Sequence, residues 1–281
     1  MIDLHTHTQC SDGTDTPLAL VKKAASSGIT ILGLADHDTT SGWEEARASL
    51  HGDLQLVLGA EISALTLDGI SVHMLGLLFD GSNDALQQIL ADSRDTRVPR
   101  MRKMVENLQA AGYEIALDDV AAAAPVGATL GRPHLADALV SRKIVKSRDE
   151  AFAELLHNDS PFYVSHYAPT PEEAIRAVRA AGGVAVIAHP FASRRGQSLD
   201  AQSFQSLVEA GLNGIEVFHR DQNEEERAQL IAIARELDLV ITGASDYHGI
   251  GKLNQLGENT TAPEEWERLE SMADQRRVVR R

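Results

Sequence analysis

Short apolar runs alternate with amphipathic segments along most of the 281-residue chain. The apolar runs predict buried strands, and they cover residues 2–4, 29–35, 54–60, 183–188, 214–218 and 238–244. Helical segments separate them, and residues 17–27 and 41–50 are two examples, with Ser41 as the expected N-cap of the second. Continuous apolar strands alternating with helices predict an α/β fold with a parallel sheet covered on both sides. Repeated around the chain, this pattern predicts a barrel of the β/α type.

The middle of the chain departs from this rhythm. Residues 82–111 predict a long helix with an interruption at Pro99, and the strand alternation then stops until about residue 170. Short helical pieces are expected at 118–124, 134–140 and 148–157. We therefore predict a barrel formed by residues 1–99 and 170–281, capped by a helical insertion of residues 100–169.

The last stretch, residues 263–281, is charged and weakly patterned, so we expect it to be peripheral. Hydrophobic residues make up 43% of the chain, which is enough for a sizeable core. The single cysteine, Cys10, excludes an intrachain disulfide.

The net charge of −15 disfavours nonspecific binding to duplex DNA, which depends on spread basic charge. The chain has no apolar run of membrane length, and its start lacks the regions of a signal peptide. These features predict a cytoplasmic protein that binds neither duplex DNA nor a membrane. They leave the oligomeric state open.

Residues of the kinds that bind metal ions stand where five predicted strands end. These residues are His5, His7, Asp12, Asp36, His37, Asp38, Glu61, His189, Asp246 and His248. In a β/α barrel, the carboxyl ends of the strands meet on one face, where active sites lie. Taken singly, Asp36 and Asp38 could cap a helix, Glu61 could join an ion pair, and each histidine could be a hydrogen-bonded core residue. Gathered together they would be costly to bury without cations, so we predict a metal site.

His73 stands near the start of an apolar run, within a predicted hairpin of residues 62–76. A two-residue turn would place Glu61 and His73 on opposite faces of the hairpin. A three-residue loop, Leu67-Asp68-Gly69 with Gly69 in the left-handed conformation, would place them on the same face. We predict the second geometry, because it returns His73 to Glu61.

Four motifs together resemble those of the PHP (polymerase and histidinol phosphatase) family. The motifs are His5-Thr6-His7, Asp36-His37-Asp38, Ala188-His189-Pro190 and Ser245-Asp246-Tyr247-His248. The resemblance covers about residues 1–90 and 170–255, and it implies a distorted (β/α)7 barrel with a metal cluster.

Two further motifs, together with the insertion, are similar to the nucleotide-phosphatase branch of that family. These motifs are Ala35-Asp36-His37-Asp38-Thr39-Thr40-Ser41-Gly42 and Gly131-Arg132-Pro133-His134. This branch removes the 3′-phosphate from 3′,5′-nucleotide bisphosphates, and related members trim short RNA from its 5′ end.

The resemblance implies two or three divalent ions. The implied ligands are His5, His7, Glu61 and Asp246 for the first ion; Glu61, His73 and His189 for the second; and Asp12, His37 and His248 for the third. Some family members have a histidine where Asp12 stands, so the third site departs from their pattern. Mixed imidazole and carboxylate ligands suit manganese, iron or zinc, and the family favours manganese.

Two such ions, roughly 3.5–4 Å apart, would lower the pKa of a shared water, and the bridging hydroxide would attack the phosphoester. We expect Glu61, Asp246 and His189 to carry this catalysis. Asp36 and Asp38 are expected to orient imidazoles. The sequence does not indicate a general acid.

Candidate substrate contacts are fewer. Arg132 and His134 are expected to bind a substrate phosphate, although Arg132 beside Pro133 could equally mark a helix start. Arg194 follows His189 on a predicted loop at the active-site face, and His219 follows the strand at 214–218 in the same manner.

The predicted function is a phosphatase that acts on small phosphorylated nucleotides such as 3′,5′-bisphosphates. Three alternatives remain: a 5′→3′ exoribonuclease on short RNA, a histidinol-phosphate type of phosphatase, and a noncatalytic metal-binding module. The Gly131-Arg132-Pro133-His134 motif disfavours the histidinol-phosphate type, and the filled ligand positions disfavour the noncatalytic module.

Overall fold

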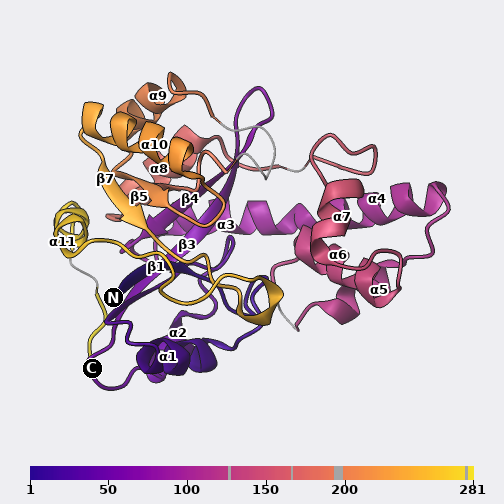
Figure 1. Ribbon diagram of the computed structural model, residues 1–281, viewed down its shortest axis with the longest axis horizontal. Coiled ribbons are helices and arrows are strands. Elements are labelled where there is room, and N and C mark those ends of the chain that lie inside the picture. The colour runs from indigo at the N-terminus through magenta and orange to yellow at the C-terminus, as the bar shows by residue number, and fades with distance from the viewer. Residues whose placement is uncertain (126–127, 166, 193–198, 276–277) are drawn as a thin grey trace.

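A computed structural model describes residues 1–125, 128–165, 167–192, 199–275 and 278–281. Within these ranges the chain forms one seven-stranded sheet, whose strands follow one another in chain order (Figure 1). The strands are β1 (Ile2–Thr6), β2 (Ile31–Leu34), β3 (Gln55–Leu65), β4 (Ser71–Leu77), β5 (Val184–Ala188), β6 (Gly214–Phe218) and β7 (Val240–Gly243). The strands predicted from the apolar runs are therefore confirmed.

The sheet curls into a nearly closed barrel. Strands β1 to β3 pair in parallel, as do β5 to β7, while β4 runs antiparallel to both β3 and β5. The backbone N–H of His7 donates to the carbonyl of Tyr247 at 2.8 Å, which brings β1 beside the segment that follows β7. The predicted distorted seven-stranded β/α barrel is thus confirmed, and the reversed strand β4 is part of its distortion.

The helices fall into two groups. Those beside the barrel strands are α1 (Pro17–Ser26), α2 (Trp43–Ala48), α3 (Asp84–Asp95), α8 (Pro171–Ala180), α9 (Ser203–Ala210), α10 (Glu224–Glu236) and α11 (Pro263–Ser271). Those of the middle segment are α4 (Arg97–Ala110), α5 (Leu117–Ala123), α6 (Arg132–Ser141) and α7 (Arg148–Glu154), and a short 3-10 helix covers Gly249–Gly251. None of the described helices is long and apolar enough to cross a membrane.

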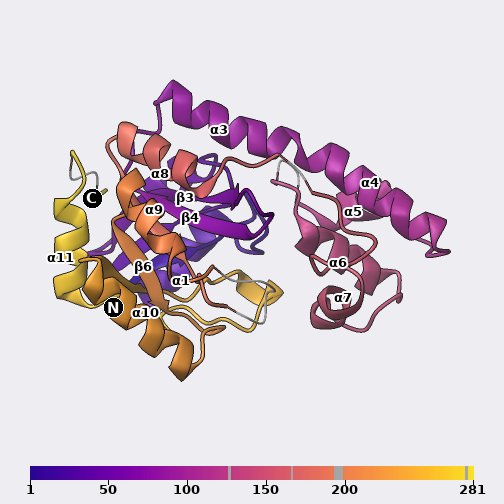
Figure 2. The same ribbon diagram turned by 90° about the horizontal axis from the view of Figure 1, so that it is seen from above.

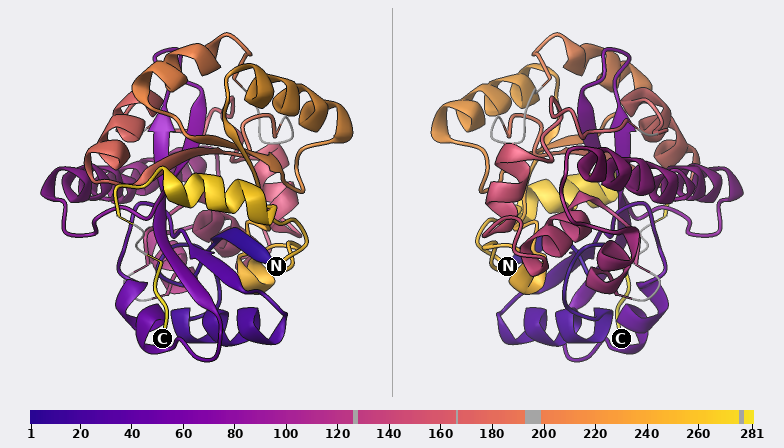
Figure 3. Two further views of the ribbon diagram at one scale, coloured as in Figure 1. Left: turned by 90° about the vertical axis from the view of Figure 1, so that its left-hand side faces the viewer. Right: turned by 90° about the vertical axis from the view of Figure 1, so that its right-hand side faces the viewer.

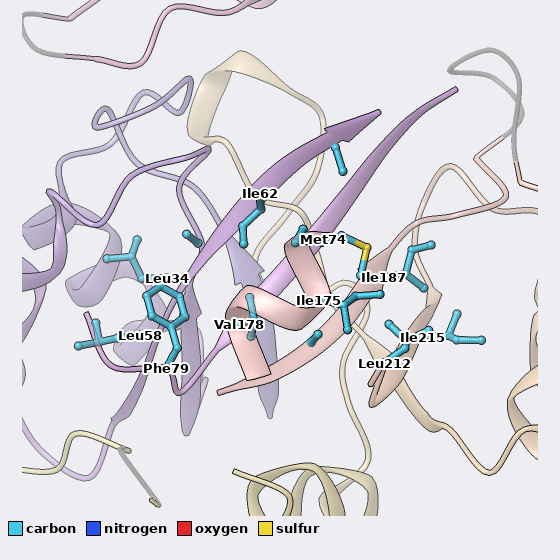
Figure 4. Packing of buried hydrophobic residues seen from close by; sticks show 14 of the residues in the cluster. Leu34, Leu58, Ile62, Met74, Phe79, Ile175, Val178, Ile187, Leu212 and Ile215 are labelled. Atoms are coloured by element: carbon cyan, nitrogen blue, oxygen red, sulfur yellow. The ribbon is translucent and has the colours of Figure 1, made fainter. Parts of the chain in front are cut away.

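Alternate residues of each strand face the outer helices. Leu58 and Ile62 of β3 pack with Ile175 and Val178 of α8 in the largest hydrophobic cluster (Figure 4). Because side chains alternate along a strand, Glu61 on β3 points to the opposite face, into the barrel. The outer layer therefore holds the strands while their inner face remains available for polar residues.

Helix α11 contributes to the barrel interior. Its Trp266 and Leu269 are buried in a second cluster with interior residues of the strands, such as Val57 and Leu75. The helix crosses the end of the barrel opposite α5–α7 (Figure 3), and Leu56 and Val279 exchange backbone hydrogen bonds. The predicted peripheral position of residues 263–281 is therefore wrong, because Trp266 and Leu269, three residues apart, are buried against the interior of the barrel.

The middle segment has a core of its own, formed by Met101, Leu108, Leu135, Leu139 and neighbouring apolar residues. Helices α3 and α4 together form a long rod that joins this segment to the barrel (Figure 2). The predicted insertion boundaries, 100 and 169, stay a prediction.

Two local expectations were wrong. The long helix breaks at Thr96 instead of Pro99, because the proline ring clashes with the carbonyl four residues earlier and is tolerated in a helix's first turn. Helix α2 is preceded by Gly42 without a side-chain cap, since the hydroxyl of Ser41 is bound to Thr39 instead.

Candidate metal centre

An irregularity in β1 turns both histidines of the first motif into the barrel. Asp3 pairs with Leu32 and Thr6 pairs with Leu34, so β1 contains one residue more than β2 over this stretch. Such a bulge reverses the alternation of side chains. It allows Ile2 and His5 to face the interior together, although they are three residues apart.

The β3–β4 hairpin returns His73 to Glu61. Thr66 and Ile70 close a loop of residues 67–69, in which Gly69 has a φ of 90°. His73 pairs with Ser63, and its Nδ1 lies 2.7 Å from Oε1 of Glu61. The predicted three-residue loop and the shared face are therefore confirmed.

Glu61 is the common neighbour of five imidazoles. Its Oε2 lies 3.2 Å from His5 Nε2, 3.1 Å from His7 Nε2 and 3.2 Å from His37 Nδ1. Its Oε1 lies 2.7 Å from His73 Nδ1 and 3.2 Å from His189 Nε2. One buried carboxylate thus contacts histidines from the end of β1, from β4 and from the loops after β2 and β5. This is the arrangement expected of a ligand shared by two ions.

Asp246 and Asp12 complete the cluster. Oδ1 of Asp246 lies 3.5 Å from His5 Nε2 and 3.3 Å from His7 Nε2. Oδ1 of Asp12 lies 3.1 Å from His248 Nε2, and its Oδ2 lies 3.8 Å from His37 Nε2. Three groups of side chains are therefore close enough to hold a cation: His5, His7, Glu61 and Asp246; His37, Glu61 and His73; and His7, Asp12, His37 and His248.

The donor atoms fit divalent cations. Within the described part of the chain, His37 Nδ1 and His248 Nε2 are buried without a hydrogen-bond partner, although carboxylate oxygens lie 3.2 and 3.1 Å away. A nitrogen lone pair facing a carboxylate oxygen is unfavourable unless a cation lies between them. The cluster is therefore able to bind metal ions, and the assignment of particular ligands to particular ions remains a proposal.

The carboxylates of this cluster are strongly acidic. Burial alone would raise the pKa of Glu61, Asp12 and Asp246, but neighbouring imidazoles hold each pKa well below its usual range. For Asp246 the ammonium group of Lys252, 3.1 Å from its Oδ2, lowers the pKa most, and His248 and His5 add to its effect. These three groups are anionic at neutral pH, as metal ligands must be.

The imidazoles divide into two kinds. Burial lowers the pKa of His37 to about 3 and that of His248 to about 4, so both are neutral at pH 7. For His5 and His7, nearby carboxylates outweigh burial and raise the pKa, to about 9 for His7. A metal ion would displace protons from His5 and His7 but none from His37 and His248.

Backbone strain collects at the same place. Asp38, His189 and Asp246 have φ values of 52°, 31° and 52°, in the left-handed region that residues other than glycine rarely adopt. Such strain persists where surrounding contacts enforce it, and it is frequent at functional sites.

Asp36 and Asp38, which we expected to orient imidazoles, have other partners. Asp36 accepts hydrogen bonds from the backbone and hydroxyl of Thr8 and from Ser11, so it braces the loop after β1. Asp38 binds Ser63 and the guanidinium of Arg97. The hydroxyl of Ser11, which donates to Asp36, also lies 3.5 Å from His7 Nδ1, and the predicted role of the two aspartates stays a prediction.

Sequence reasoning missed two side chains at the cluster. Glu216 of β6 is fully buried, and its Oε1 lies 3.0 Å from His5 Nδ1. The sequence could have indicated this residue, because it is a lone carboxylate within the apolar run 214–218, and a buried charge is rarely tolerated without a partner. Lys252 lies in a loop and carried no comparable signal.

The four predicted substrate residues have different fates. Arg132 and His134 belong to the first turn of α6, and Arg132 also lines a pocket of about 90 Å³ that includes His73 and His189. His219 is fully buried, and its Nε2 lies 3.3 Å from Oδ2 of Asp246, so its predicted substrate contact stays a prediction. Arg194 lies outside the described residues.

A β/α barrel with imidazoles and carboxylates at its strand ends defines the class of metal-dependent hydrolases. The PHP domain model matches residues 3–122. The 3′,5′-nucleoside bisphosphate phosphatase of Chromobacterium violaceum is 32% identical over 252 residues, which are 89% of this chain and 88% of that protein. A 5′-3′ exoribonuclease of Haemophilus influenzae is also 32% identical, over 92% of this chain and 93% of the length of that enzyme.

A crystal structure from Bifidobacterium adolescentis, described provisionally as a metal-dependent phosphoesterase, superimposes with a TM-score of 0.89. It is 40% identical and covers 96% of both chains. The chain therefore belongs to the PHP family, and it is a metal-dependent phosphoesterase.

Proposed function

We propose that this protein removes the 3′-phosphate from 3′,5′-nucleotide bisphosphates. The observation that carries the proposal is a pair of guanidinium groups: that of Arg132, which lines the pocket at the metal cluster, and that of Arg100, which lies over the same Tyr163 ring. They offer a binding site for a second phosphate, distinct from the phosphate that reacts. The bisphosphate phosphatase of Chromobacterium violaceum supports the same assignment.

The two guanidinium groups converge on one aromatic ring. The Cζ atoms of Arg100 and Arg132 lie 5.1 and 5.3 Å from the centre of the Tyr163 ring. Burial and the neighbouring charge of Arg132 lower the pKa of Arg100 to about 10. Two like charges held together out of water are unfavourable, and an anion bound between them would offset that cost.

These two charges are not neutralised internally. Arg97, the third arginine in this region, pairs with Asp38. Arg132 donates to the carbonyl of Leu156 and the side-chain oxygen of Asn158, and Arg100 donates to the carbonyl of Val164. In the described ranges, no carboxylate forms an ion pair with Arg100 or Arg132, so their charge is available to a phosphate.

The pocket lies where the insertion and the barrel meet. Arg132 and Asn158 line it from the middle segment, and His73, His189 and Pro190 line it from the barrel. A substrate with two phosphates could place one at the barrel side and the other at the arginines. Such a pocket favours a small nucleotide over a long polymer.

We assign the ions as the family resemblance implies. His5, His7, Glu61 and Asp246 would hold the first ion, Glu61, His73 and His189 the second, and Asp12, His37 and His248 the third. Bound ions would supply activation of water near neutral pH and neutralisation of phosphoryl charge, and manganese is our preferred metal. Glu61 would fix the spacing of the first two ions, since its two oxygens face different imidazoles.

His134 is a further candidate substrate contact. Its Nδ1 accepts a hydrogen bond from the backbone N–H of Gly131 at 3.1 Å, which leaves the ring proton on Nε2. Burial lowers its pKa, so the imidazole is neutral and could donate one hydrogen bond to a phosphate oxygen. Arg194 stays a candidate on sequence grounds alone.

A 5′→3′ exoribonuclease activity on short RNA is the second candidate. The relative from Haemophilus influenzae bears that name at the same level of identity as the phosphatase. In an RNA substrate, a phosphate next to the scissile bond could occupy the same arginine site. The two activities would therefore share the metals and the arginines, and would differ in the ester that is cleaved.

The test is phosphate release from adenosine 3′,5′-bisphosphate with added Mn²⁺, compared with AMP, histidinol phosphate and a short 5′-phosphorylated RNA. We expect rapid turnover of the bisphosphate that is lost with a chelator, and little turnover of AMP or histidinol phosphate. Mononucleotides released faster from RNA than phosphate from the bisphosphate would favour the exoribonuclease. Preferred hydrolysis of histidinol phosphate would contradict both assignments.

A further inference from the structure

Glu216 contacts two of the proposed ligand residues with its two carboxylate oxygens. Its Oε1 lies 3.0 Å from Nδ1 of His5, and its Oε2 accepts a hydrogen bond of 3.0 Å from the backbone N–H of His189. The side chain is fully buried in the barrel interior. It is absent from the three groups of side chains that could hold a cation. Its carboxylate therefore contacts the ligand residues on atoms that do not point into the cluster.

The first contact selects one tautomer of His5. A carboxylate only accepts hydrogen bonds, so the ring proton must lie on Nδ1 of His5. Once a metal ion has displaced the second proton of the ring, the lone pair is on Nε2, which faces His7 Nε2 at 3.0 Å and Glu61 Oε2 at 3.2 Å. An imidazole can bind a metal only through a nitrogen that carries no proton. Glu216 thus leaves free the one nitrogen of His5 that points into the cluster.

The second contact fixes the turn in which His189 leaves β5. The backbone of His189 has a φ of 31°, a conformation that is unfavourable for residues other than glycine. The hydrogen bond from its N–H to Glu216 helps to hold this conformation. In it, Nε2 of His189 lies 3.2 Å from Oε1 of Glu61. The same carboxylate therefore orients a second imidazole through the backbone.

We propose that Glu216 is a positioning residue that prepares His5 and His189 together for metal binding. One side chain would thereby align a ligand of the first ion with a ligand of the second. Its negative charge would also compensate the positive charge of the bound ions. The inference rests on the proposed ligand assignment, and it does not depend on which phosphoester is the substrate.

The test is Glu216→Gln in the full-length chain. The amide has one accepting oxygen and one donating nitrogen, so it cannot accept from both His5 and His189. Either His5 adopts the other tautomer, with a proton on Nε2, or the hydrogen bond to His189 is lost. We expect the affinity for Mn²⁺ to fall about 10–100-fold, as when partners of metal ligands are removed elsewhere.

Two readouts separate positioning from a structural role. Titration of the chelator-treated protein with Mn²⁺, followed by the electron paramagnetic resonance of free Mn²⁺, gives the affinity without any substrate. Long-range ¹⁵N–¹H correlation spectra of the metal-free protein, recorded at a pH high enough for the His5 ring to carry a single proton, give the tautomer of His5. We expect Nδ1–H in the wild type, and either Nε2–H or mixed tautomers in Glu216→Gln.

Thr242→Val is the matched control. Thr242 is the register partner of Glu216 on β7, is buried, and donates only to the carbonyl of Ile215. We expect it to lower the melting temperature without changing the Mn²⁺ affinity or the His5 tautomer. Glu216→Asp, which keeps the charge but is one methylene shorter, should bind Mn²⁺ with an affinity between those of the wild type and Glu216→Gln.

Wild-type Mn²⁺ affinity in both Glu216 variants, or an equal loss of affinity in Thr242→Val, would overturn the inference. If Glu216→Gln does not fold, Glu216→Asp and the control still decide the question. Normal Mn²⁺ binding by the wild type, together with failure to hydrolyse the bisphosphate, would count against the proposed substrate and leave this inference intact.

Discussion

Individual side chains of this protein have several partners, and Glu61 is the clearest case. Its two oxygens lie within 3.2 Å of nitrogens from five histidines, and the group is almost fully buried. A carboxylate in that position neutralises and spaces any cations that the imidazoles bind. It is the residue whose loss should affect the most contacts at once.

We expect Glu61→Gln to reduce turnover by more than about 100-fold, because removing even an indirect partner of a metal ligand costs about 10–100-fold. The measurement is kcat with the preferred phosphoester at saturating Mn²⁺. Glu258→Gln, at an exposed ion pair with Arg220, should keep wild-type turnover. Comparable activity of Glu61→Gln and the wild type would exclude a bridging role for Glu61.

The pKa shifts predict how the stability of the metal-free protein depends on pH. The raised pKa of His7, about 9, contributes stability that is complete below pH 6.5 and is lost as the pH rises to 9. The lowered pKa values of His37 and His248, about 3 and 4, make stability fall as the pH drops below 6.5. The melting temperature should therefore be highest near pH 6.5.

Thermal melts of the chelator-treated protein between pH 5 and pH 9 would measure this profile. Added Mn²⁺ should reduce the alkaline decline, because the cation replaces the protons that the imidazoles lose. A melting temperature that keeps rising from pH 6.5 to pH 9 without metal would contradict the assigned protonation.

Residue-level prediction from sequence succeeded where a side chain follows from a strand end or a loop length. His73 could be predicted because a three-residue loop with Gly69 fixes which face it shares with Glu61. Glu216 was missed although its lone carboxylate in an apolar run indicated a buried partner, because the strand alone does not show that the side chain faces the cluster. For His219, its place after a strand does not show that its ring is buried against Asp246.

Among the elements, α4 joins the middle segment to the metal cluster through a buried ion pair. Its Arg97 is buried, forms an ion pair with Asp38 and donates to Ser63 at 2.7 Å. Asp38 adjoins His37, and Ser63 is two residues from Glu61. The start of α4 is therefore anchored to the same two strand ends that supply these imidazole and carboxylate groups.

Arg97→Met should lower the free energy of unfolding by about 3–5 kcal/mol, because it leaves the buried carboxylate of Asp38 without its cation. Chemical denaturation would measure the change. Arg220→Met breaks an exposed ion pair and should cost at most about 1 kcal/mol. Equal effects of the two substitutions would show that the buried pair does not anchor α4.

Element types were predictable from periodicity, and element ends were less so. Apolar runs identified the strands because burial on both faces requires them to be continuously apolar. The break at Thr96 and the cap of α2 depend on local steric and hydrogen-bond details that periodicity does not contain. Helix α11 was misjudged because its polar face dominates its composition, whereas Trp266 and Leu269 determine its position.

At the scale of the whole molecule, the barrel would supply the proposed metal ligands and the middle segment the proposed phosphate-binding arginines. Arg132 contacts Leu156 and Asn158 within its own segment, while the pocket that it lines includes His73 and His189. The choice of substrate would then depend on how the two parts face each other, and the chemistry on the barrel alone.

Arg132→Met should lower kcat/KM for the bisphosphate about 10–100-fold, since a hydrogen bond to a charged group contributes roughly 1.5–3 kcal/mol. Methionine keeps apolar contact with Phe152 and Tyr163, which limits damage to the insertion. Hydrolysis of a 3′-monophosphate that lacks the second phosphate should hardly change. An equal loss on both substrates would place Arg132 outside the second phosphate site.

The most direct test of the central claim is a crystal structure of the Mn²⁺-loaded protein with anomalous diffraction data at the manganese edge. The ligand assignment predicts two or three anomalous peaks at the strand ends, with Glu61 between the first two. One peak should be bounded by His5, His7 and Asp246, and the next by His73 and His189. A single ion, or ions that do not contact Glu61, would contradict the account.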